Sequence, residues 1–401
     1  MRSRAKPGKV ASLYSDAMRT GVFLFGGVEM DDAGAGPPAP TDRRYDSKEV
    51  WRATEQILEM GVLADRLGFD SFWLTEHHFQ FEGYEVVPNG LMTGAVLAER
   101  TQNIRIGTMF NVVGQWHPLK LAEDFATLHN LSGGRGVLGI GRGTVPRESE
   151  NLGSKVGSFD NPDKVDADDF NRKQFDEATT VLRLALDNES FSFHGEVFDF
   201  PVPGIPDRGG FVEELSLLPR PLYPYEIWQA VTSPPTLEAV PTKGWGGVMW
   251  LKHYTFMKQF WDRFAELHCE VHGSELAPGE KRMLVLNTCV ADTHEAAVES
   301  VRNGHDEFWK FLGPYGWSRG YMGPDGKPSP AGLIPTLEES IENKVWLVGT
   351  ADEVAEQIAW YADHLGGIEN LTLFPGMPGD RYEKVGDQMH RLAEDVLPQL
   401  R

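Results

Sequence analysis

Glu76, His77 and His78 are adjacent residues whose side chains can move protons, and they directly follow an apolar run at residues 72–74. Histidine has an unperturbed pKa near neutrality, which suits general acid–base catalysis, and the neighbouring carboxylate could orient it. Residues at the exit of a strand point alternately to opposite faces, so only one histidine can face a given cavity. A histidine hydrogen-bonded in a core or loop is the structural alternative.

Arg142 lies in a glycine-rich segment, G-I-G-R-G at residues 139–143. The spacing differs from the G-x-G-x-x-G fingerprint of dinucleotide-binding folds, and Pro146 and polar residues follow where a helix would be needed. An arginine at a strand end can bind a phosphate in two places, and its flanking glycines let a ligand approach the backbone. The alternative is a structural ion pair.

Thr232, Ser233 and Thr236 offer hydroxyls and backbone N–H groups at the predicted start of a helix. Such a helix end is a typical anion site. Taken alone, the same residues are equally typical of a plain helix N-cap. Together with Arg142 they predict a phosphate clamp.

The elements that must position these residues alternate between strand and helix. Apolar runs predict eight strands, at residues 21–25, 70–74, 104–110, 136–140, 226–231, 247–251, 283–290 and 368–374. Helical periodicity predicts helices at residues 46–67, 89–100, 118–131, 174–186, from 234, 255–272, 293–312, 351–365 and 382–397. We expect long insertions after the fourth and seventh strands, at residues 144–172 and 313–335, and hairpin-like structure at residues 191–211.

Eight strands, each followed by a helix, predict an α/β protein with the (β/α)₈ TIM-barrel fold. An open doubly wound sheet is the alternative. Active sites of such barrels lie at the carboxyl ends of the strands. His77, Phe110, Arg142, Ser233 and Trp250 are all at or just past those ends, which favours a catalytic role for the Glu-His-His motif.

Composition excludes several classes of protein. The 401 residues carry a net charge of −21, which disfavours nucleic acid and anionic membranes, and no apolar run approaches the roughly 18 residues of a membrane span. Two cysteines, Cys269 and Cys289, suit a reducing cytoplasm, and no cluster has metal-ligand spacing. We expect a metal-free cytoplasmic protein with an N-terminal extension at residues 1–20, which lacks a signal peptide's apolar core, and a single domain at residues 21–401.

The chain resembles the bacterial luciferase-like flavin monooxygenases. The resemblance begins near Gly21 and covers nearly the whole remaining chain, with motifs in the family's order. These motifs are Gly68-Phe69-Asp70, residues 73–79, Gly107-Thr108, His117-Pro118 with Glu123-Asp124, Gly134-Arg135, residues 139–143 and Val348-Gly349-Thr350. The family fold is also a (β/α)₈ barrel.

The resemblance implies a role for each candidate residue. His77 would be catalytic, with Glu76 orienting it and His78 in support. Arg142 would bind the phosphate of FMN, completed by Thr232, Ser233 and Thr236. Three further residues would lie near the isoalloxazine: Met109 and Phe110, where the family places a non-proline cis peptide, and Trp250.

The implied activity is that of a two-component flavin-dependent monooxygenase. A separate NAD(P)H:flavin reductase would supply FMNH₂, which reacts with O₂ to a C4a-hydroperoxide that transfers one oxygen atom to a small organic substrate. The alternatives are an F420-dependent oxidoreductase, against which the Glu-His-His motif favours FMN, and a non-catalytic flavin-binding barrel, against which His77 argues. Family analogy also implies a homodimer through the early barrel helices and a lid at residues 313–335.

The chain also departs from luciferase. Gly141 stands where the luciferase α subunit has a reactive cysteine. The insertion at residues 144–172 and the proline-rich residues 220–225 are also unlike luciferase. These differences argue against light emission and a long-chain aldehyde substrate, and leave flavin binding unaffected.

Overall fold

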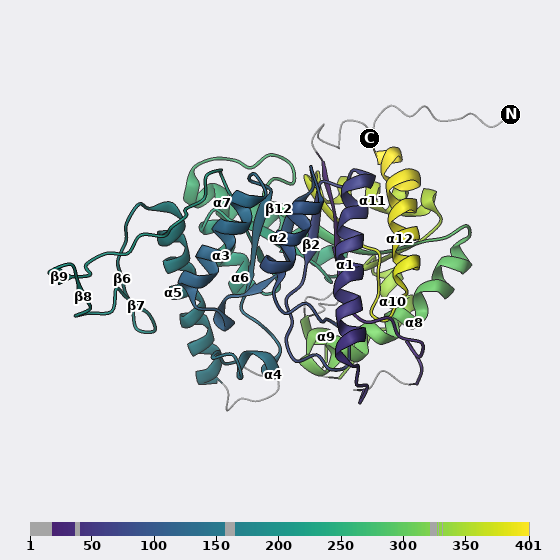
Figure 1. Ribbon diagram of the computed structural model, residues 1–401. Helices are drawn as coiled ribbons and strands as arrows, with labels where there is room; N and C mark the ends of the chain where they lie inside the picture. Colours follow the sequence, from purple (N-terminus) through teal and green to yellow (C-terminus); the bar gives the residue numbers. More distant parts are fainter. Residues whose placement is uncertain are drawn as a thin grey trace.

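The computed structural model describes residues 18–36, 41–156, 165–320, 327, 329–330 and 332–400. At its centre, parallel strands close into a barrel surrounded by helices (Figure 1). The barrel strands are β1 (Arg19–Leu24), β2 (Ser71–Leu74), β3 (Arg105–Thr108), β5 (Gly136–Gly141), β10 (Ile227–Ala230), β11 (Gly246–Met249), β12 (Arg282–Val290) and β14 (Asn370–Phe374). Pairing of β5 with β10 and of β14 with β1 closes the ring. The predicted (β/α)₈ barrel is confirmed, and a closed ring excludes the open sheet.

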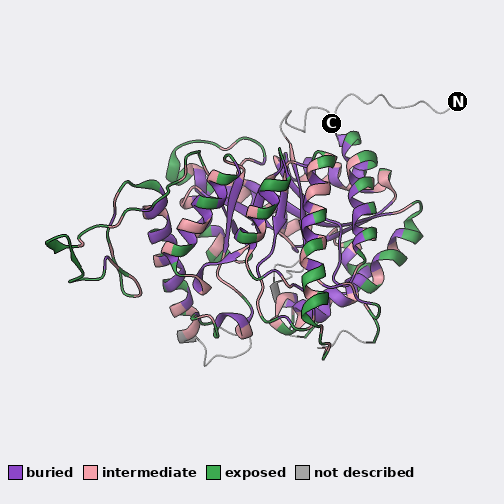
Figure 2. Ribbon diagram, in the orientation of Figure 1, coloured by how far each residue is buried: buried purple, intermediate pink, exposed green. Residues whose placement is uncertain are grey.

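The longer helices pack around this barrel with their buried faces toward it and their exposed faces outward (Figure 2). They are α1 (Ser47–Leu67), α2 (Gly90–Arg100), α3 (Pro118–Leu131), α5 (Val165–Asp187), α6 (Pro234–Thr242), α7 (Tyr254–His272), α8 (His294–Leu312), α11 (Ala351–Leu365) and α12 (Tyr382–Arg391). Although α1 and α12 are far apart in sequence, they lie side by side (Figure 1). Within the described ranges no helix is long and apolar enough to cross a membrane.

The sequence specifies the ends of α1 through local chemistry. The side chain of Asp46 accepts hydrogen bonds from the amides of Lys48 and Glu49, and the side chain of Glu49 accepts one from the Asp46 amide. This reciprocal pair is the predicted capping box. Gly68 ends the helix with a φ of 78°, a left-handed conformation that favours glycine. The end of α1 therefore fixes where strand β2 and the Glu-His-His motif begin.

The remaining helices and strands are shorter. They are β4 (Asn111–Val112), η2 (Val113–Gln115), α4 (Pro146–Ser149), β6 (Phe193–His194), β7 (Asp199–Phe200), β8 (Pro206–Asp207), β9 (Gly210–Phe211), η4 (Gly313–Tyr315), α9 (Trp317–Gly320), α10 (Leu337–Glu342), β13 (Trp346–Gly349), η5 (Leu392–Val396) and η6 (Leu397–Leu400). The antiparallel pairs β6–β7 and β8–β9 confirm the predicted hairpins and extend away from the barrel (Figure 1).

Two elements differ from the prediction. β13 pairs with β12 as an additional strand that the sequence pattern does not predict. Helix α5 begins at Val165, well before the predicted start at residue 174. Its first turns carry polar residues, including Asp168 and Asn171, which contact Arg142 and therefore show no apolar periodicity. Residues 157–164 of the predicted insertion, and residues 1–17 of the predicted extension, lie outside the described residues.

Candidate functional site

The segment after β3 contains a cis peptide bond between Met109 and Phe110, as the resemblance predicts. The neighbouring strand β5 carries glycines at two places where this segment approaches it closely. A Cβ at Gly139 would lie 1.7 Å from the carbonyl oxygen of Thr108, and one at Gly141 would lie 3.2 Å from the Cβ of Phe110. These glycines make room for backbone and an aromatic side chain, whereas the sequence pattern predicts room for a ligand.

His77 lies between two buried carboxylates. Its Nδ1 is hydrogen-bonded to Oε1 of Glu148 at 3.0 Å, and its Nε2 lies 2.6 Å from Oε2 of Glu85. Both glutamates are only 1% exposed. Only the contact with Glu148 has hydrogen-bond geometry, and both oxygens of Glu85 have no hydrogen-bond partner among the described residues. The cluster therefore brings one imidazole and two buried carboxylates together, and one of these carboxylates is left unpaired.

Glu76 does not orient His77, so this part of the prediction is wrong. Its Oε1 accepts a hydrogen bond from Nε1 of Trp116 at 2.8 Å and is bonded to Nε2 of His78 at 3.3 Å. Adjacent residues point to opposite faces here, so Glu76 and His78 share one face and His77 takes the other. Burial raises the pKa of Glu76 despite its bonds to His78 and Trp116.

Glu85 and Glu148 are the partners that the sequence prediction misses. Glu85 follows the histidines after a short loop, and it stands beside Tyr84, Val86 and Val87. A carboxylate among such apolar residues is a signal that could have been read. Glu148 comes from α4, in the insertion after β5, and its distance of 71 residues from His77 gives no local signal.

Behind His77, a charged network fixes the aromatic wall of the site. The ring of Phe311 lies 5.6 Å from that of His77 and stacks on Tyr84 at 5.0 Å. The hydroxyl of Tyr84 donates to Glu307 at 2.8 Å, and Glu307 also binds Arg43 and Lys310. Burial favours the neutral acid, but the bonds from Arg43 and its neighbours outweigh this and lower the pKa of Glu307.

Replacing Glu307 by leucine is expected to lower the free energy of unfolding by about 3–5 kcal/mol, because Arg43 and Lys310 lose their buried counter-charge. Since the folded-state pKa of Glu307 is lowered, its contribution is present above its usual pKa and is lost as the pH falls. Urea titrations at neutral and acidic pH measure both effects. Glu299→Ala, an exposed change on the same helix, should cost less than about 0.5 kcal/mol. Equal losses for the two variants would contradict this account.

Arg142 follows β5 and is paired with acceptors from α5. Its Nη1 donates to Oδ1 of Asp168 at 3.1 Å and to Oδ1 of Asn171 at 3.3 Å. Burial tends to raise the pKa of Asp168, but bonds from Arg172 and Arg142 outweigh it and lower this pKa. Asp168 is therefore an anion, and it binds the guanidinium of Arg142 in the place where a phosphate is expected. The ion pair that was the structural alternative is present in this structure.

Thr232, Ser233 and Thr236 form the start of α6. The amides of Thr232 and Ser233 both donate to Oγ1 of Thr236, each at 3.1 Å, and Ser233 and Thr236 form a capping box. The predicted helix start is present, and it has the form of an N-cap. Because Gln229 of β10 pairs with Ile140 of β5, this helix start emerges beside Arg142. The two halves of the predicted clamp therefore follow adjacent strands.

Trp250 follows β11 and lies among aromatic rings at the carboxyl end of the barrel. Its ring centre is 5.4 Å from that of Phe23 and 5.9 Å from that of Phe374, and its Nε1 donates to Oδ1 of Asn287 at 2.8 Å. Trp317, from the predicted lid, lies 5.8 Å away. Trp317 of the predicted lid thus contacts an aromatic residue at the barrel mouth. Residues 321–326, 328 and 331 of that lid lie outside the described residues.

Several polar groups at this end of the barrel have no hydrogen-bond partner among the described residues. They are the buried atoms Thr75 Oγ1, Asn111 Oδ1, Gln229 Oε1 and Asn287 Nδ2. Buried amides and hydroxyls are normally paired, so unpaired groups gathered at strand ends are typical of a ligand site. An amide within an apolar strand, such as Gln229, is a signal that the sequence prediction overlooks.

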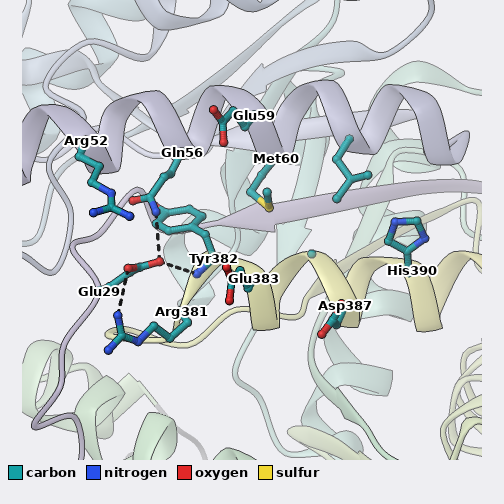
Figure 3. Close-up of a pocket in the computed structure, with 12 residues that line it drawn as sticks. Glu29, Arg52, Gln56, Glu59, Met60, Arg381, Tyr382, Glu383, Asp387 and His390 are labelled. Carbon is teal, nitrogen blue, oxygen red and sulfur yellow. Dashed lines mark hydrogen bonds and ion pairs between the residues drawn. The ribbon is translucent and has the colours of Figure 1, made fainter.

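Other parts of the described chain carry fewer features of a functional site. No group of three or more His, Cys, Asp or Glu side chains in the described ranges could hold a metal ion. A cavity of about 500 Å³ lies between α1 and α12 (Figure 3). There Glu29 accepts from Gln56 at 3.1 Å and from the Tyr382 amide at 2.9 Å, and it pairs with Arg381. None of the predicted site residues lines this cavity.

Comparison with known proteins gives consistent similarities. The model of the family described as luciferase-like monooxygenase matches residues 18–366. The 3,6-diketocamphane 1,6-monooxygenase of Pseudomonas putida is 28% identical over 352 residues, covering 80% of this chain and 87% of that protein. The F420-dependent glucose-6-phosphate dehydrogenase of Amycolatopsis mediterranei is 26% identical over 362 residues, covering 86% and 94%.

A solved structure shows the same fold. It is the oxygenating constituent of 3,6-diketocamphane monooxygenase from Pseudomonas putida, in complex with FMN. It superposes on this chain with a TM-score of 0.70 at 21% sequence identity, covering 95% of this chain and 98% of that one.

Proposed function

Because the chain belongs to the luciferase-like monooxygenase family, we propose that it uses FMNH₂ and O₂ to oxygenate a small organic substrate. One oxygen atom enters the substrate, the other leaves as water, and FMNH₂ is oxidised to FMN. The observation that carries the proposal is that two groups of side chains meet at one end of the barrel. His77 and its buried carboxylates lie at the same carboxyl ends of the strands as the guanidinium of Arg142.

The residues at the barrel mouth fit FMN. Arg142 and the amides of Thr232 and Ser233 would hold the phosphate after releasing their present acceptors, Asp168 and Thr236. The unpaired polar atoms of the preceding strands would serve the ring system. The Met109–Phe110 segment and Trp250 would border that ring system with apolar surface. Bound in this place, FMNH₂ would supply the electrons that activate O₂.

His77 would manage the protons of the reaction. Formation of water from one oxygen atom requires protons to be delivered inside a site that excludes bulk solvent. His77, with Glu148 hydrogen-bonded to one ring nitrogen and Glu85 close to the other, would deliver these protons. The rings of Phe311 and Trp250, with Trp317 from the lid, would exclude water. We propose that the lid closes over the flavin.

A separate NAD(P)H:flavin reductase would supply the FMNH₂. Support comes from the similar structure described as the oxygenating constituent of a monooxygenase. A homodimer through the early barrel helices is also proposed. The side chains of Met92 and Val96, one helical turn apart on α2, are 70% and 42% exposed, and that of Leu131 on α3 is 70% exposed. Light scattering that gives the mass of a single chain would rule this dimer out.

F420-dependent hydride transfer is the second candidate function, and similarity to an F420-dependent dehydrogenase supports it. Titration of the purified protein with FMN and with F420, each oxidised and anaerobically reduced, tests the choice. We expect the FMN forms to bind more tightly. Tighter binding of F420, with no effect of FMN as a competitor, would replace the flavin proposal.

A further inference from the structure

Lys252, three residues after the end of β11, is a buried cation that the proposed reaction does not use. It is 2% exposed, and its Nζ donates to the carbonyl oxygen of Thr232 at 3.0 Å. The same ammonium lies 4.4 Å from the ring centre of Phe260 on α7. Among the described residues no carboxylate pairs with it. An ammonium has three donors and a buried charge is normally paired, so this group lacks a counter-ion.

Its position connects Lys252 to the predicted phosphate clamp. Strand β11 pairs with β10, with Val248 opposite Ala230, so residues that follow the two strands emerge together. Thr232, whose carbonyl accepts from Lys252, follows β10, and Arg142 follows the adjacent strand β5. Arg142 already has a counter-ion in Asp168. Lys252 therefore contributes positive charge that no neighbour cancels.

We propose that Lys252 is the buried cation of an oxyanion site formed at the ends of β5, β10 and β11, and that it binds the phosphate of the flavin. The proposal rests on the proposed function and extends it to a residue outside the sequence prediction. The site would recognise a phosphate monoester, whether carried by the flavin or by another small molecule. Riboflavin, FMN and inorganic phosphate distinguish these sources.

The electrostatic state of Lys252 gives the inference a pH signature. Burial lowers its pKa to about 8. The groups in contact with its ammonium are the Thr232 carbonyl and the Phe260 ring. The ion pair of Arg142 and Asp168 follows β5, the strand next to β10. His253, its chain neighbour, has a pKa lowered by burial and is neutral throughout the alkaline range. A change in affinity above pH 8 therefore reports Lys252.

The sign of the effect follows from the charge. A phosphate monoester is largely a dianion above about pH 7, since its second pKa is about 6. Below pH 8 the ammonium is charged and attracts it. As the pH rises above 8 the ammonium loses its proton, so FMN affinity should fall, whereas riboflavin affinity should stay nearly constant.

The experiment is a fluorescence titration of the full chain with FMN and riboflavin between pH 7 and 9.5, in the wild type and in Lys252→Met. We expect the variant to bind FMN about 10- to 100-fold more weakly at pH 7, as for a lost charge-assisted bond, and to lose the decline above pH 8. Lys243→Met removes a lysine of the neighbouring α6–β11 loop that pairs with Asp176, and should behave as wild type. Lys252→Met should melt at or above the wild-type temperature at pH 7, because it removes a buried unpaired charge.

Two outcomes separate this inference from the proposed function. If Lys252→Met binds FMN as tightly as wild type, with the same pH dependence, the inference is overturned while flavin binding stands. If the wild type ignores FMN but binds inorganic phosphate in a Lys252-dependent way, the oxyanion site stands and the flavin proposal falls. Absence of both FMN and phosphate binding would overturn the two together.

Discussion

Replacing His77 by alanine is expected to lower the yield of oxygenated product by about 10²- to 10⁴-fold, the usual contribution of general acid–base catalysis. FMN affinity should change little, because the residues proposed to bind its phosphate follow other strands, β5 and β10. The yield of product per NADH consumed, with a flavin reductase present, measures the first quantity. Flavin titration measures the second.

The neighbours of His77 provide matched controls. Glu85→Gln and Glu148→Gln each remove one of its carboxylate partners and should reproduce part of the defect. Glu76→Gln disturbs His78 and Trp116 instead. In protein labelled with ¹⁵N-histidine, the imidazole signals of His77 should therefore move in Glu85→Gln and stay in place in Glu76→Gln. An undiminished product yield in His77→Ala would remove His77 from the reaction.

Replacing Arg142 by alanine is expected to weaken FMN binding by about 1–3 kcal/mol, which corresponds to roughly 5- to 150-fold. Its guanidinium directly follows β5, and its loss would leave Lys252 as the remaining side-chain cation proposed to bind the phosphate. Asp168→Asn should have the opposite effect, because it removes the anion that holds Arg142 now. Titration with FMN measures both.

Arg172 is the control for Arg142, because it binds the same Asp168 carboxylate from a more exposed position. Arg172→Ala should leave FMN affinity within about twofold of wild type. If Arg142→Ala behaves in the same way, Arg142 has only the role of a structural ion pair and the phosphate assignment is wrong.

The barrel could be predicted because each strand is a buried apolar run and the flanking helices carry strong end signals. Asp46 and Gly68 mark both ends of α1, for example. β13 was not predicted because eight other apolar runs already complete the barrel; it pairs with the last four residues of β12, outside the closed ring. The start of α5 was not predicted because its polar side chains face Arg142 and the neighbouring loop, where no apolar periodicity is needed.

The positions of the candidate site residues could be predicted, but their contacts with one another only in part. The sequence places His77 and Arg142 correctly at strand ends, because that property depends on the fold alone. It pairs His77 with its neighbour Glu76, whereas the partners are Glu85 and Glu148. Contacts between a loop and an insertion far away in the sequence depend on how the chain folds back in three dimensions. Local sequence patterns carry no information on that. The same reason hides Lys252, which a sequence pattern shows only as a lysine after a strand.

The most direct test of the proposed function is isotopic. The protein, a flavin reductase, NADH and FMN are incubated under ¹⁸O₂ with a panel of small organic substrates, and products are examined by mass spectrometry. The account predicts a product that carries one labelled oxygen atom and disappears when FMN, O₂ or this protein is omitted. Substrate conversion that proceeds with reduced F420 and without O₂, with no labelled product from any substrate, would contradict it.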